Sequence, residues 1–301
     1  MPHVESRGGV RIFYDRFDPI DADPASRRTP VLLLNHLATN RRMWTPAAME
    51  GMRRGHPVIA VDGRGCGRSD APLRPWSTTD MAHDALAVLD HAGVGRAHVC
   101  GISLGGLIAQ EIAIRFPERT AALVLMATFG GAPRMDLMSM VQLNRISLAQ
   151  MRTGGSREAA ARRVLGELIS REFAAAVEPG DPAWELVNDV LDEPVRKRGV
   201  LGQVLAGSRH ASWGRLKRIQ APTQVQHGTA DTLFPVRAGE LLAERIRGAE
   251  FVALDGLGHG LVFQDPDLCL SHLFDFVARH DAALSEPLPE AEAEAAPGQA
   301  A

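Results

Sequence analysis

Short apolar runs alternate with longer stretches of helical periodicity along most of this chain. The runs are apolar throughout, which is typical of strands that are covered on both faces of a sheet. Strands that alternate with helices in this way predict a mainly parallel, doubly wound sheet of the α/β class. The predicted strands cover residues 31–34, 58–61, 97–100, 122–125, 223–226 and 250–254, and the predicted helices residues 79–92, 104–116, 237–246 and 267–280.

The alternation of predicted strands and helices stops after Ala127 and resumes only near Pro222. The stretch between them is helical with loops, so we expect a helical cap, residues 131–216, inserted into a core made of residues 1–130 and 217–285. Such a cap would cover the carboxyl edge of the sheet, where ligands bind in open α/β folds. Residues 10–14 are predicted to form an antiparallel edge hairpin. Residues 286–301 are acidic and rich in alanine and proline, which predicts a disordered tail.

Composition excludes several classes of partner. The net charge is −3, and no long basic cluster occurs, so we expect no binding of nucleic acid or of an anionic membrane. The three cysteines are far apart and form no CxxC pair, which fits a reducing compartment. The first residues contain no apolar segment of the kind that a signal peptide needs. We therefore expect a cytoplasmic protein, and the sequence does not indicate its oligomeric state.

Ser103 stands at the centre of the sequence Gly101-Ile102-Ser103-Leu104-Gly105, which matches G-x-S-x-G. The predicted strand that precedes this motif and the predicted helix that follows it provide the strand–turn–helix setting of a nucleophile elbow. The turn is so tight that its flanking positions require glycine. Ser103 is therefore the candidate nucleophile, and the start of the helix offers backbone N–H groups for developing negative charge.

A serine hydroxyl needs a base, and His259 is the best placed of the 11 histidines. It lies among glycines in Gly258-His259-Gly260, on the loop after the last predicted strand. His227 also follows a strand, but there a structural role is favoured. The orienting carboxylate is predicted to be Asp231, after the strand at 223–226, with Asp255 as the alternative.

These motifs together resemble the α/β-hydrolase superfamily over residues 5–280, so the α/β-hydrolase fold is the expected fold. The order Ser103, Asp231, His259 is that of the family. Residues 62–69, Asp-Gly-Arg-Gly-Cys-Gly-Arg-Ser, resemble its D-x-R-G-x-G-x-S loop, which also accounts for a superficial likeness to a dinucleotide-binding loop. Haloalkane dehalogenases and epoxide hydrolases share the fold but use aspartate at the elbow, so Ser103 argues against both.

The segment after the strand at 31–34 departs from the family's His-Gly and reads Asn35-His36-Leu37-Ala38-Thr39. It is similar to the 3-oxoadipate enol-lactonase branch, which has Asn-Ser-Leu-Gly-Thr and a Met-Trp pair there. The resemblance implies that the backbone N–H groups of Leu37 and Leu104 form the oxyanion hole. His36 either donates a hydrogen bond in the site or is merely structural, and both readings stay open.

The start of the cap is dense in methionine and leucine, and we expect Met135, Met138 and Leu143 to line an apolar substrate pocket together with His36. The alternative is that these side chains pack the cap's own core. No zinc-binding or P-loop spacing occurs, so we expect no metal and no cofactor. The predicted function is hydrolysis of a small-molecule carboxylic ester or lactone. C–C bond hydrolysis, cofactor-free haloperoxidase-like perhydrolysis and a non-catalytic binding module stay open.

Overall fold

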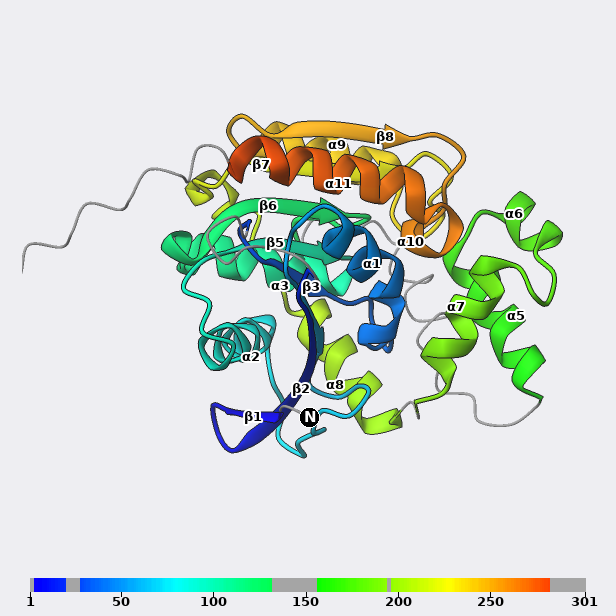
Figure 1. Cartoon of the computed structure of the whole chain (residues 1–301), viewed down its shortest axis with the longest axis horizontal. Coiled ribbons are helices and arrows are strands. Elements are labelled where there is room, and N and C mark those ends of the chain that lie inside the picture. The colour runs from blue at the N-terminus through cyan, green and yellow to red at the C-terminus, as the bar shows by residue number, and fades with distance from the viewer. Residues whose placement is uncertain (1–2, 20–27, 132–155, 194–195, 282–301) are drawn as a thin grey trace, which may run out of the picture.

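A single sheet of eight strands organises the computed structural model, which describes residues 3–19, 28–131, 156–193 and 196–281 (Figure 1). The strand order is β1-β2-β4-β3-β5-β6-β7-β8. The strands from β3 to β8 pair in parallel, whereas β1 and β2 form an antiparallel hairpin that joins the sheet beside β4. Their bounds are β1 His3–Ser6, β2 Val10–Phe17, β3 Val31–Leu34, β4 Val58–Asp62, β5 Ala97–Ile102, β6 Thr120–Met126, β7 Thr223–Gly228 and β8 Glu250–Leu254.

Helices cover both faces of the sheet and so bury its central strands completely. The apolar residues of α2, α3 and α9 join one core cluster, and those of α1, α10 and α11 join another on the opposite face. Every residue of β3, β4, β5 and β6 is buried, which is why these strands are apolar without alternation. The helices are α1 Thr45–Arg53, α2 Thr78–His91, α3 Leu104–Arg115, α9 Val236–Arg245, α10 Leu261–Gln264 and α11 Pro266–Asp281.

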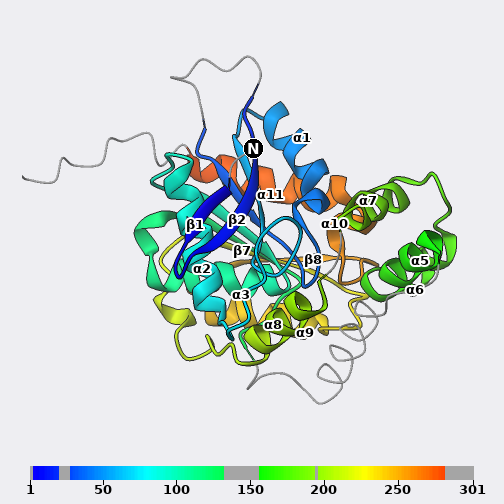
Figure 2. The ribbon, with the colours of Figure 1, turned by 90° about the horizontal axis from the view of Figure 1, so that it is seen from below.

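The chain between β6 and β7 leaves the sheet and forms further helices. These are α5 Arg157–Leu168, α6 Arg171–Ala176, α7 Pro182–Leu191 and α8 Lys197–Ser208. Both ribbon views place α5, α6 and α7 together at one end of the molecule beside α10, whereas α8 lies against the core near α3 (Figures 1 and 2). The boundaries expected for a cap at residues 131 and 216 stay a prediction.

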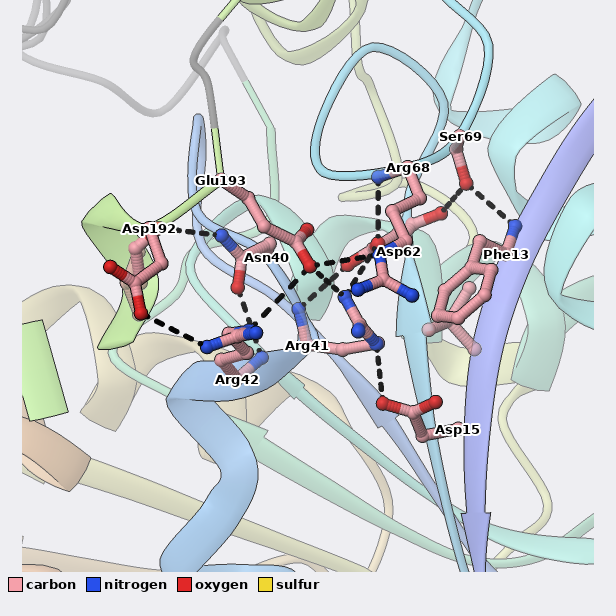
Figure 3. A network of polar contacts seen from close by, with 12 residues as sticks. Phe13, Asp15, Asn40, Arg41, Arg42, Asp62, Arg68, Ser69, Asp192 and Glu193 are labelled. Carbon is pink, nitrogen blue, oxygen red and sulfur yellow. Dashed lines mark hydrogen bonds and ion pairs between the residues drawn. The ribbon is translucent and has the colours of Figure 1, made fainter. Parts of the chain in front are cut away.

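The segment at residues 62–69, which begins with the last residue of β4, forms a turn held by hydrogen bonds. The buried carboxylate of Asp62 accepts hydrogen bonds from the backbone N–H groups of Arg41, at 2.8 Å, and Arg68, at 2.9 Å (Figure 3). Gly67 has a φ of 49°, and a Cβ there would lie 2.2 Å from the Asp62 carboxylate. Arg64 is fully buried and paired with Asp84. Gly67 therefore serves the turn itself.

The predicted α/β class and the mainly parallel sheet are confirmed, as is the antiparallel hairpin at the N-terminal edge. The predicted strands and helices all occur, with ends that differ by at most two residues. Two helices of the core were not predicted, α1 and the four-residue α10. Within the described residues, no helix is long and apolar enough to cross a membrane.

Candidate active site

Ser103 occupies a sharp turn between β5 and α3. Its φ of 55° and ψ of −116° form a strained conformation that the surroundings impose. A Cβ at Gly101 would lie 2.2 Å from the carbonyl oxygen of Gly105, so only glycine allows the strand and the helix to meet this closely. The turn is fixed by hydrogen bonds from the Ser103 N–H to Met126 O, at 2.9 Å, and from the Thr128 hydroxyl to Ser103 O, at 2.8 Å. The Ser103 hydroxyl is thereby held at the carboxyl edge of the sheet.

His259 lies on the loop between β8 and α10 and reaches Ser103. The distance from its Nε2 to Ser103 Oγ is 2.9 Å, and its side chain is buried. The glycines on either side of it are required by packing, because the end of α5 and the residues that link it to α6 lie against them. A Cβ at Gly258 would come within 2.5 Å of Ser170 N, and one at Gly260 within 2.9 Å of Leu168. The inserted helices thus help to fix the position of the histidine.

Asp231 lies on the loop after β7 and accepts a hydrogen bond of 2.8 Å from His259 Nδ1 on its Oδ2 atom. Its other oxygen, Oδ1, accepts the N–H groups of Leu233 and Phe234, at 2.8 and 2.9 Å. Burial raises the pKa of this carboxyl, but the opposing effects of His259 and of the hydrogen bonds from His227 and His259 are larger, and the net pKa lies well below its ordinary value. Asp231 is therefore ionised at neutral pH and oriented by donors on both oxygens.

A second histidine contacts the same carboxylate, which sequence reasoning missed. His227 Nε2 lies 3.2 Å from Asp231 Oδ2 and 2.9 Å from the carbonyl oxygen of Phe234. Since both neighbours are acceptors, Nε2 carries the proton. Gly239 packs so closely that a Cβ there would lie 2.5 Å from His227 Nδ1, so the ring has no room to turn away. His227 is therefore part of the support of Asp231; the only signal in the sequence was its place at a strand end, four residues before that aspartate.

The alternative acid, Asp255, has a different partner. Its carboxylate accepts a hydrogen bond of 3.0 Å from the hydroxyl of Thr229, and it is exposed. The structure brings Asp231 and not Asp255 to His259.

The segment after β3 runs directly beside the elbow. The N–H of Gly105 donates to Asn35 O at 2.9 Å, and a Cβ at Gly105 would lie 2.1 Å from Leu34 O. Leu37 follows Asn35 by two residues, and Leu104 directly precedes Gly105, in the two segments that this hydrogen bond joins. Within the part of the chain that the structure describes, neither of their backbone N–H groups has a hydrogen-bond acceptor. An oxyanion hole requires unused donors of this kind, and the assignment of these two N–H groups to one stays a prediction.

His36 also lies in this site. Its ring centroid is 5.0 Å from that of His259 and 6.3 Å from that of Phe263. The side chain is 3% exposed, and its buried Nε2 has no hydrogen-bond partner among the described residues. Burial, followed by the charge of His259, lowers the pKa of His36 well below its ordinary value, although Asp231 opposes this. His36 is therefore a neutral imidazole at neutral pH, with one nitrogen able to donate and the other able to accept.

The comparison with protein-family models decides the family. The model of the alpha/beta hydrolase fold matches residues 29–266, which is most of the chain. The chain belongs to the alpha/beta hydrolase fold family.

Relatives of this α/β-hydrolase have several activities. The chain is 30% identical to the rhodomycin D methylesterase of Streptomyces sp. (strain C5), with 81% of this chain and 87% of the relative covered. It is 32% identical to the poly(3-hydroxyalkanoate) depolymerase of Ectopseudomonas oleovorans, with 77% and 78% covered. The crystal structure of the enol-lactonase from Burkholderia xenovorans LB400 matches with a TM-score of 0.77 at 25% identity, covering 92% of this chain and all of that one. The expected resemblance to esterases and lactonases is thus confirmed.

Three residues predicted to line the substrate pocket of this α/β-hydrolase, Met135, Met138 and Leu143, lie outside the described residues. A cavity of about 510 Å³ lies between α6, α7 and α10. Its lining includes Phe173, Leu186 and Phe263, but neither Ser103 nor His259. Because Phe263 also contacts His36, this apolar cavity borders the site without containing the serine.

Proposed function

We propose that this chain is a serine-dependent hydrolase of carboxylic esters or lactones. The observation that carries the proposal is the continuous hydrogen-bonded row from Asp231 through His259 to Ser103, with contacts of 2.8 and 2.9 Å. A base that is held against a hydroxyl and oriented by a buried carboxylate is the arrangement that activates a serine. The methylesterase, the depolymerase and the enol-lactonase similar to this chain are named for carboxylic ester or lactone chemistry, which supports the same reaction class.

The proposed reaction proceeds in two halves. His259 Nε2 takes the proton of Ser103 as Oγ attacks the carbonyl carbon, and it then gives this proton to the departing alcohol oxygen. In a lactone that oxygen stays tethered to the acyl group. Water, deprotonated by the same histidine, attacks the acyl-enzyme and releases the acid and free Ser103. The N–H groups of Leu37 and Leu104 donate to the carbonyl oxygen while it carries negative charge.

The substrate is expected to combine an apolar part with a second polar group near the scissile carbonyl. The apolar part would contact the start of the cap, where Met135, Met138 and Leu143 occur in the sequence. The polar group would meet His36, whose buried Nε2 has no partner among the described residues. A hydroxyl or second carbonyl on the substrate would satisfy this nitrogen, and leaving it unsatisfied is costly.

A panel of substrates tests the proposed function. Nitrophenyl esters of increasing acyl length and small and large lactones should be hydrolysed, and Ser103→Ala should be inactive towards each of them. A dienone and a peroxide assay run beside them. Turnover of the dienone alone would establish a C–C bond hydrolase, and peracid formation alone a perhydrolase. Binding of such compounds by the folded protein without turnover would favour a binding module.

Replacing His227 by leucine should slow the reaction and change its pH profile. The contact of His227 Nε2 with Asp231 Oδ2 is one of the effects that lower the pKa of Asp231, so without it the carboxylate should attract a positive charge on its other partner more strongly. The acidic limb of kcat/KM should therefore move to higher pH, and kcat should fall on the order of tenfold. Steady-state kinetics from pH 5 to 9 measure both effects.

His227→Gln is the matched variant, because its amide nitrogen can occupy the position of Nε2. It should restore a profile close to that of the wild type. An unchanged profile in His227→Leu would show that the contact with Asp231 has no influence on the base.

A further inference from the structure

Ala38, one residue beyond the proposed oxyanion donor Leu37, adopts a left-handed conformation with a φ of 57°. This region is unfavourable for residues other than glycine, so the surroundings must hold the backbone there. Ala38 is 8% exposed, and its N–H is buried with a single partner. The conformation of this peptide unit therefore depends on what that partner is.

The partner is a side chain from the inserted helices. Gln203, on α8, accepts the Ala38 N–H on its Oε1 atom at 2.9 Å, in a buried contact. Its amide nitrogen donates to Arg64 O at 3.0 Å, and Arg64 is itself fixed by Asp84. Gln203 is only 2% exposed, so its orientation is set on both ends. One amide group thus ties the segment after β3 to the turn after β4.

The same segment makes further contacts with the inserted helices. Asn40 donates from Nδ2 to Val190 O on α7 at 2.8 Å. Arg41 pairs with Glu193, just after α7, at 2.8 Å, and also with Asp62 and Asp15 of the core (Figure 3). In Figure 3 these side chains converge between the core strands and the end of the inserted helix.

On the other side of Leu37, Asn35 is held by residues of the core. Asn35 donates from Nδ2 to Val61 O at 2.8 Å and accepts the indole N–H of Trp44 at 2.9 Å. Its carbonyl oxygen accepts the N–H of Gly105, at the start of α3. The peptide unit that carries the Leu37 N–H therefore lies between an anchor in the core and an anchor in the inserted helices.

We propose that Gln203 is a positioning residue for the oxyanion hole. By holding Ala38 in the left-handed region, it keeps the Leu37 N–H directed at the carbonyl oxygen of a substrate on Ser103. The inference rests on the proposed serine hydrolase function. It makes the inserted helices part of the catalytic apparatus, because the oxyanion hole is complete only when α8 is docked on the core.

The test replaces Gln203 by methionine, which fills the same volume without a hydrogen bond. The rate of Ser103 phosphonylation by a fluorophosphonate and kcat for an ester should both fall 10- to 100-fold, whereas KM should change less than threefold. Hydrogen–deuterium exchange of the peptide spanning residues 35–42 should become faster. Gln203→Asn, which keeps a polar group but is one methylene too short, should behave in the same way and covers the case in which the methionine variant does not fold.

Two matched variants separate positioning from general damage. Ala38→Gly removes the penalty on the left-handed conformation, so the double variant Ala38→Gly/Gln203→Met should regain much of the lost rate. Gln224→Met removes another buried glutamine, whose hydrogen bond to Gln226 lies in β7, and should leave the labelling rate unchanged.

The outcomes are distinguishable. If the probe labels the wild type on Ser103, and the Gln203 variants are labelled and turn over substrate at the same rates as the wild type, the positioning role is overturned. The proposed hydrolase function would still stand. Faster hydrogen–deuterium exchange of residues 35–42 without a loss of labelling rate or kcat would also overturn the positioning role. A folded wild type that the probe never labels on Ser103 would overturn the proposed function and this inference with it.

Discussion

Replacing Ser103 by alanine is expected to lower kcat for ester hydrolysis by about 10⁴-fold or more, with little change in stability. The Ser103 hydroxyl has one side-chain partner in the described structure, His259 Nε2 at 2.9 Å, so its removal takes away the attacking atom and little else. Alanine keeps the Cβ, and the backbone hydrogen bonds that fix the turn do not involve the hydroxyl. Steady-state kinetics on the best ester of the panel measure the loss, and thermal unfolding checks the fold.

Thr128→Ser is a suitable control for the Ser103 experiment. It keeps the hydroxyl that donates to Ser103 O and alters only a methyl group at the same turn. Its kcat should stay within a few-fold of the wild type. If Ser103→Ala kept more than a tenth of the wild-type kcat, another group would have to supply the nucleophile.

Replacing Asp231 by asparagine is expected to lower kcat on the order of 10⁴-fold. The N–H groups of Leu233 and Phe234 require an oxygen at the position of Oδ1, so the new amide nitrogen must face His259. This nitrogen donates where the carboxylate accepted. His259 can then keep only the tautomer with its proton on Nε2, which cannot accept the proton of Ser103.

Asp255→Asn is the matched control for Asp231→Asn. Because Asp255 contacts Thr229 and not His259, its replacement should leave kcat nearly unchanged. The reverse pattern, with a large loss in Asp255→Asn and a small one in Asp231→Asn, would contradict the assignment of the acid.

The fold was predictable because burial of the central strands on both faces produces short apolar runs that can be recognised in the local sequence. Strands buried on both faces are mostly apolar, and β3, β4, β5 and β6 are buried at every position, with polar residues only near their ends. Helices α1 and α10 were harder to predict. The first contains proline, glycine and few large apolar residues, and the second is a single turn of four residues. Neither carries a periodic apolar pattern long enough to stand out.

The candidate triad was predictable because each member follows a strand, and the carboxyl ends of parallel strands lie at the same edge of the sheet. Its supports were not predictable in the same way. His227 has no neighbour in the sequence that indicates a contact with Asp231 rather than a core position. Gln203 lies 165 residues from Ala38 along the chain, and the sequence of α8 contains no motif that predicts this contact. Such contacts depend on how the inserted helices dock, which local patterns do not encode.

The measurement that tests the central claim most directly is covalent labelling of the purified protein with a fluorophosphonate, followed by peptide mass spectrometry. A serine made nucleophilic by His259 should yield one adduct, on the peptide that contains Ser103, and His259→Ala should not be labelled. No adduct on the folded wild-type protein, or an adduct that persists in His259→Ala, would contradict an activated serine at this site.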